Sequence, residues 1–133
     1  GIRDAAQSRG LGDVYKRQSM KSAPFGIVGL ETSVSLTITE LVDKGWITPM
    51  QMAEKMSYNP AKVIGSDRGS LEVGKDADIV IFNPKKTYQI DKNNFASKGR
   101  NTPFDGRTVT GEVEYTICGG KMIYEKEMTG EKA

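Results

Sequence analysis

A chain of 133 residues can form one ordinary domain, but it is too short for a complete α/β barrel, which needs about 250 residues. Its single cysteine, Cys118, excludes an internal disulfide and indicates a reducing compartment, so we expect a cytoplasmic protein. No apolar run reaches the roughly 18 residues of a membrane span, and we expect no membrane association.

The net charge of +2 originates in the first eighteen residues. Residues 1–18 hold four basic and two acidic side chains, whereas the remaining residues hold fifteen of each. A basic arm for nucleic acid is one interpretation. A foreign segment is the other, because Ser8–Gln18 back-translates to the transposon end of a sequencing adapter and Gly1–Asp4 fits its outer part. We therefore expect residues 1–18 to be adapter-derived and disordered, and we expect no nucleic-acid partner.

Residues 19–66 are expected to form a loop followed by helices. Between Glu31 and Lys44, four apolar residues recur with helical spacing before Gly45 ends the helix: Val34, Ile38, Leu41 and Val42. We expect these side chains to form the buried face.

Two further helix starts follow. Thr48-Pro49-Met50-Gln51 combines a capping threonine, a proline suited to the first turn and a glutamine that completes a capping box. Asn59-Pro60 repeats the signal, which predicts a new short helix that stops at Gly65.

Residues 67–133 have a pattern of short apolar runs and turn residues that is typical of β-structure. The apolar run Ile79–Phe82 predicts a strand covered on both faces and ended by Pro84, with another short strand from Thr87 to Ile90. Val109–Cys118 predicts a long strand with a bulge or kink at Gly111. Gly119-Gly120 then predicts a two-residue hairpin loop that returns through Met122–Tyr124.

The stretch Ala23–Thr32 reads A-P-F-G-I-V-G-L-E-T. Its glycines permit backbone angles closed to other residues, so the pattern by itself fits a tight loop that packs Phe25 into a core. The stretch also resembles the segment after the last catalytic motif of class I dihydroorotases. Two other stretches support that resemblance: Leu71–Phe82 is similar to a signature of the amidohydrolase superfamily, and Asn101–Gly106 is similar to dihydroorotases and hydantoinases.

The resemblance implies an α+β fragment. Residues 19–66 would be the terminal helices of a metal-dependent hydrolase barrel of the TIM type, and residues 67–133 the C-terminal part of a small β-sandwich. The parent enzyme would interconvert dihydroorotate and N-carbamoyl-aspartate with two zinc ions, and it could be a homodimer. In the family the metal ligands and the general base lie upstream of this chain, which contains no histidine.

The resemblance assigns substrate binding to Phe25 and Gly26, and assigns neither catalytic residues nor metal ligands to this chain. We therefore expect the chain itself to be inactive and to bind no zinc. Glu112 and Glu114 alternate along a predicted strand beside threonines, and we expect both to be solvated surface residues.

Two alternatives remain. One is another cyclic amidohydrolase, such as a hydantoinase or allantoinase, although the A-P-F-G-I-V-G-L-E-T stretch favours dihydroorotase. The other is a non-catalytic, structural relative of dihydroorotase, because the ligands that would decide lie outside the chain.

Overall fold

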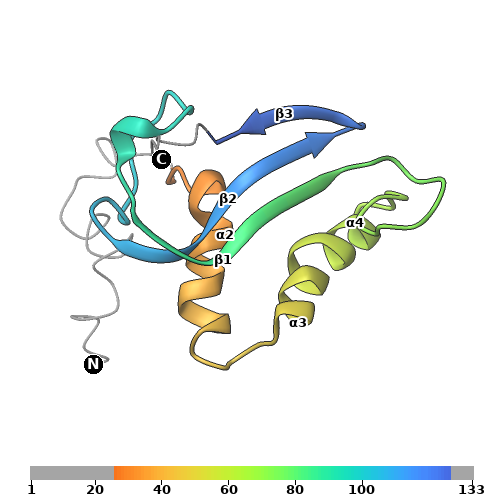
Figure 1. Ribbon diagram of the computed structural model, residues 1–133, viewed down its shortest axis with the longest axis horizontal. Helices are drawn as coiled ribbons and strands as arrows, with labels where there is room; N and C mark the ends of the chain where they lie inside the picture. The colour runs from red at the N-terminus through yellow and green to blue at the C-terminus, as the bar shows by residue number, and fades with distance from the viewer. Residues whose placement is uncertain (1–25, 127–133) are drawn as a thin grey trace, which may run out of the picture. The chain divides into compact units, whose positions relative to one another are not determined.

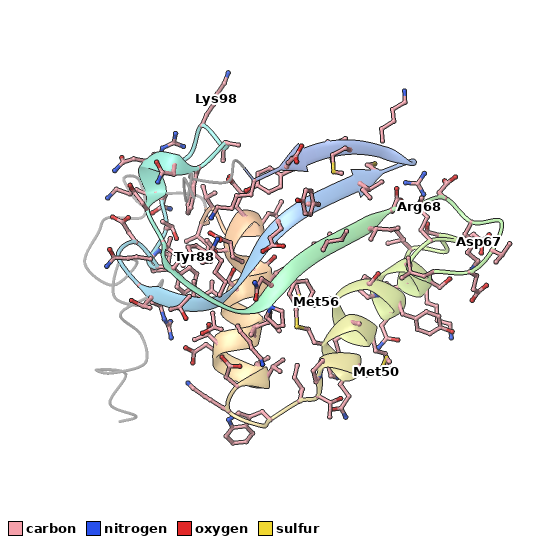
Figure 2. All side chains as sticks on the ribbon, in the orientation of Figure 1. Met50, Met56, Asp67, Arg68, Tyr88 and Lys98 are labelled. Carbon is pink, nitrogen blue, oxygen red and sulfur yellow. The ribbon has the colours of Figure 1, made fainter. Side chains whose placement is uncertain are left out.

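The computed structural model describes residues 26–126, which form two compact units. One unit contains residues 26–33 and 89–108, and the other contains residues 34–88 and 109–126. The adapter-like residues 1–18 and Phe25 lie outside the described residues. The described secondary structure is α+β, with helical segments followed by a three-stranded sheet (Figure 1).

The helical segment expected from Glu31 to Lys44 is present as three consecutive pieces: η1 (Leu30–Thr32), α2 (Ser33–Thr37) and the π-helical η2 (Ile38–Val42). Gly45 follows with a φ of 72° and donates its N–H to the carbonyl of Val42 at 2.9 Å, which confirms the predicted helix end.

The buried face of this helical segment agrees with the predicted one at Ile38 and differs from it elsewhere. The residues with almost no exposure are Thr32, Ser35 and Ile38, whereas Leu41 is 41% exposed. Ser35 is buried because its hydroxyl has two partners: it donates to the carbonyl of Gly111 at 2.6 Å and lies 2.8 Å from the hydroxyl of Tyr88. The apolar spacing therefore predicted the helix correctly but misplaced its contact with the sheet.

The second helical segment begins as predicted. Thr48 accepts the N–H of Gln51, and the Gln51 side chain accepts the N–H of Thr48, which is a complete capping box ahead of α3 (Pro49–Ala53). The predicted break at Asn59-Pro60 is wrong, because α3 continues through the π-helical η3 (Glu54–Tyr58) into α4 (Asn59–Val63). Pro60 is the second residue of α4, which follows the π-helical segment directly.

The sheet has the order β1-β2-β3 (Figure 1), with β1 at Ile79–Gln89, β2 at Thr108–Cys118 and β3 at Lys121–Glu125. β1 is one strand that continues through Pro84, so the predicted stop at this residue is wrong. Pro84 is tolerated because β1 is an edge strand of this sheet. The expected burial on both faces is also not seen, since Val80 and Ile81 are 48% and 44% exposed.

The predicted hairpin is confirmed. β2 and β3 pair antiparallel, and the connecting residues Gly119 and Gly120 have φ values of 54° and 75°. At the other end of β2, Gly111 has a φ of 94°, in agreement with a local distortion there. A register shift between Thr116 and Ile117 marks an additional irregularity that the sequence did not signal.

The loop before β1 is fastened to this hairpin. The guanidinium of Arg68 contacts the carboxylates of Asp76 and Asp78 at 2.8 and 2.9 Å, and Asp78 also accepts the N–H of Gly119 at 2.8 Å. The N–H of Gly119 and the charge of Arg68 lower the pKa of the Asp78 carboxyl. Asp78 thus has a structural role in this unit. Within residues 26–126, no helix has the length and apolar character that crossing a membrane requires.

Candidate functional site

Gly26 is exposed and has a φ of 84°, and no atom of residues 26–126 lies within 4 Å of the position that a β-carbon would occupy. Its neighbour in the predicted substrate-binding pair, Phe25, lies outside the described residues. A glycine in this conformation presents its backbone to an approaching molecule without a side chain in the way.

The segment after Gly26 is attached to the loop that precedes β2. The N–H of Val28 donates to the carbonyl of Asn101 at 2.9 Å, and the Asn101 side chain donates through Nδ2 to the carbonyl of Gly26. These bonds lie within one compact unit. No local pattern of residues indicates these bonds, because they join residues distant along the chain.

Glu31 reaches the same loop with its carboxylate. Oε2 accepts the N–H of Ala96 at 2.9 Å, and Oε1 accepts the N–H of Ser97 at 3.0 Å. Two consecutive backbone donors on one carboxylate form a charge-assisted, two-point attachment. The 3₁₀ turn η4 (Lys92–Asn94), which Asp91 caps by accepting the N–H of Asn93 at 2.8 Å, precedes this loop.

The described residues do not provide a donor set that fits a paired zinc site. No group of three or more His, Cys, Asp or Glu side chains in residues 26–126 is arranged to hold a metal ion, and the whole chain lacks histidine. Zinc in proteins is held by nitrogen, sulfur and carboxylate oxygen in a tight shell. We therefore assign no metal-dependent step to these residues.

Glu112 was predicted to be a solvated surface residue, and this prediction is wrong. It is 6% exposed, its Oε2 lies 2.9 Å from Nζ of Lys86, and its Oε1 contacts Nζ of Lys126. The Lys86 contact is electrostatic, because Oε2 has no partner with hydrogen-bond geometry in the part of the chain that the structure describes. Burial, with the nearby charge of Lys86 as a second cause, lowers the pKa of Lys126. A carboxylate held between two cations is suited to stabilising the fold rather than to acid-base catalysis.

Comparison with known proteins shows which family this chain resembles. The profile of the Amidohydrolase family matches residues 1–123. The chain belongs to the amidohydrolase family. Among curated relatives, a dihydroorotase of Pelotomaculum thermopropionicum is 52% identical over 103 residues, covering 77% of this chain and 24% of its own length. A dihydroorotase of Clostridioides difficile is 48% identical over 109 residues, covering 82% of this chain and 25% of its own length.

Solved structures of family members give the same fold. An L-hydantoinase from Arthrobacter aurescens superposes with a TM-score of 0.73 at 37% identity, covering 78% of this chain and 24% of its own. A D-hydantoinase from Thermus sp. has a TM-score of 0.74 at 24% identity, covering 84% of this chain and 25% of its own. At this identity the match supports a shared fold and no shared function. The chain thus spans about a quarter of the length of the relatives it matches, and it has the fold of part of a barrel-type hydrolase.

Proposed function

We propose that this chain is the C-terminal part of a cytoplasmic dihydroorotase, the enzyme that interconverts dihydroorotate and N-carbamoyl-aspartate in pyrimidine biosynthesis. The observation that carries the proposal is the identity of 52% and 48% to two dihydroorotases, against 37% to the L-hydantoinase. The same comparison weighs against the hydantoinase alternative. Residues 19–66 would end the barrel, and residues 67–133 would contribute the C-terminal strands of a β-sandwich.

The contribution of this chain to the reaction would be substrate binding by Phe25 and Gly26. In a barrel enzyme the active site is built from loops at the C-terminal ends of the strands. The absence of a side chain at Gly26 supports this role, because a planar ring could lie directly against the backbone there. Contact with this backbone would bind the ring similarly in the substrate and in the transition state, and so would lower KM.

The metal chemistry would come from residues upstream of this chain. Two zinc ions, when bound there, would activate water and polarise the amide carbonyl of the substrate. The donor set of residues 26–126 fits no such role, so we propose that the chain alone neither turns over dihydroorotate nor binds zinc in stoichiometric amounts.

The test is a substrate comparison on the full-length enzyme that contains this chain. Hydrolysis of dihydroorotate should exceed that of dihydrouracil and of a 5-substituted hydantoin by orders of magnitude in kcat/KM. A preference for either of the other rings would replace dihydroorotase by a hydantoinase-type activity. A folded full-length protein with no turnover of any of the three would favour the non-catalytic alternative.

A further inference from the structure

We propose that residues 96–101 act as a positioning clamp that fixes the backbone of Gly26–Val28 for substrate binding, with Asn101 as the main positioning residue. The inference rests on the proposed role of Gly26 in binding a cyclic amide. It goes beyond that role because it assigns a function to a polar loop that does not itself need to touch the substrate.

Asn101 attaches to both sides of the turn at Gly26. Its main-chain carbonyl accepts the N–H of Val28 at 2.9 Å, while its side-chain amide donates to the carbonyl of Gly26. The side-chain amide is the component that can be removed without breaking the main chain. A glycine with a φ of 84° has wide conformational freedom, so its orientation depends on such neighbouring contacts.

The clamp also approaches the segment at Val28 itself. A β-carbon at Gly99 would lie 2.6 Å from Cγ2 of Val28, which means that only glycine allows this contact distance. The clamp is braced internally, since the N–H of Gly99 donates to Oγ of Ser97 at 3.3 Å and the Arg100 guanidinium donates to the carbonyl of Gly99 at 3.0 Å.

Glu31 provides the other attachment point, three residues beyond Val28. Its carboxylate accepts the consecutive N–H groups of Ala96 and Ser97 at 2.9 and 3.0 Å. The clamp therefore holds the segment both at the proposed substrate-facing turn and at the start of the helix that follows. Two attachment points on one short segment restrict its orientation more than either could alone.

The first experiment uses the 133-residue chain and needs no activity. Amide hydrogen exchange at Val28 should accelerate about tenfold or more in Asn101→Ala, and likewise in Asn101→Asp, which lacks the amide donor at nearly constant volume. The matched control is Asp91→Ala, which removes a side-chain bond to Asn93 in the same unit and should leave exchange at Val28 unchanged. Equal exchange in wild type and both Asn101 variants would overturn the clamp.

The second experiment uses the full-length enzyme. Asn101→Ala and Asn101→Asp should raise KM for dihydroorotate about tenfold while kcat and metal content remain near those of wild type, because the clamp orients the binding surface and leaves the chemical step intact. Asp91→Ala should change neither constant. A loss of thermal stability with unchanged KM would show a merely structural role and overturn the inference. If exchange at Val28 accelerates in the Asn101 variants but the wild-type enzyme hydrolyses another ring, the proposed function fails. The clamp is then supported if the Asn101 variants raise KM for that other ring.

Discussion

Gly111 packs so closely on Ile38 that a β-carbon at position 111 would lie 2.3 Å from Cδ1 of Ile38. Cβ and Cγ1 of Ile38 would each be 3.3 Å away, and Ile38 is 3% exposed, so its side chain has little space into which to move. This contact sets the distance between η2 and β2 in their compact unit.

Gly111→Ala should lower the free energy of unfolding by about 2–4 kcal/mol, because it adds overpacking to the strain of a φ of 94°. Urea unfolding of the isolated chain would measure the loss. Gly106→Ala is the matched control: its φ is 75°, but nothing lies within 4 Å of the added carbon, and we expect a loss of only about 1 kcal/mol. Equal losses for the two variants would show that packing on Ile38 is unimportant.

Glu112→Gln should destabilise the fold by about 1–3 kcal/mol, because it removes the charge that compensates Lys86 and Lys126. This loss of stability is smaller than for a fully buried ion pair, since both lysines are partly exposed. Glu114→Gln, on the same strand and without a side-chain ion pair of this kind among residues 26–126, should change stability little. Thermal melts of the wild type and the two variants would measure these effects. Unchanged stability in Glu112→Gln would restore the interpretation of Glu112 as a surface residue.

Stability should fall at acid pH partly through Asp78. Its pKa is lowered from the ordinary 3.8, so the folded state binds fewer protons than the unfolded state near that pH. The stabilisation is complete above 3.8 and is lost as the pH falls through the lower, folded-state pKa. Asp78→Asn should therefore be less stable than wild type near neutrality, and the difference should shrink on acidification, as unfolding midpoints would show. A difference that stays constant with pH would contradict this assignment.

The isolated chain should self-associate through β1. Val80 and Ile81 are about half exposed on a strand that has a neighbour on only one side within the described sheet. Replacing both with lysine should shift sedimentation toward monomer. Val63→Lys, at a helical residue that is 85% exposed, should leave the association unchanged, whereas equal effects of both changes would indicate charge alone as the cause.

Local signals in the sequence predicted the local structure well. The capping box of Thr48 and Gln51, the helix end at Gly45 and the turn at Gly119-Gly120 all depend on residues adjacent in the chain, and all three are confirmed. Their chemistry is complete within a few residues, so no tertiary information is needed to predict them.

The errors share a different cause. Burial of Ser35 depends on Gly111, and burial of Glu112 depends on Lys126. Both partners are distant along the chain, so the residues around Ser35 and Glu112 do not indicate them. Pro84 was predicted to end a strand because its position at a sheet edge could not be known from the run itself. The contacts of Asn101 with Gly26 were missed for the same reason, while the substrate role of Phe25 and Gly26 rests on the resemblance and stays a prediction.

We propose that this chain contributes a substrate-facing backbone turn and no part of the metal centre. Gly26→Val in the full-length enzyme places a branched side chain at that turn, and Gly45→Val introduces a comparable strain elsewhere, since the two glycines have φ values of 84° and 72°.

The deciding measurement is kcat/KM for dihydroorotate together with metal content in these two variants. We predict that Gly26→Val loses a few kcal/mol of transition-state stabilisation with full metal content, whereas Gly45→Val keeps near-wild-type kinetics. Wild-type kcat/KM in a folded, metal-loaded Gly26→Val enzyme would contradict the account and leave the turn as a packing element.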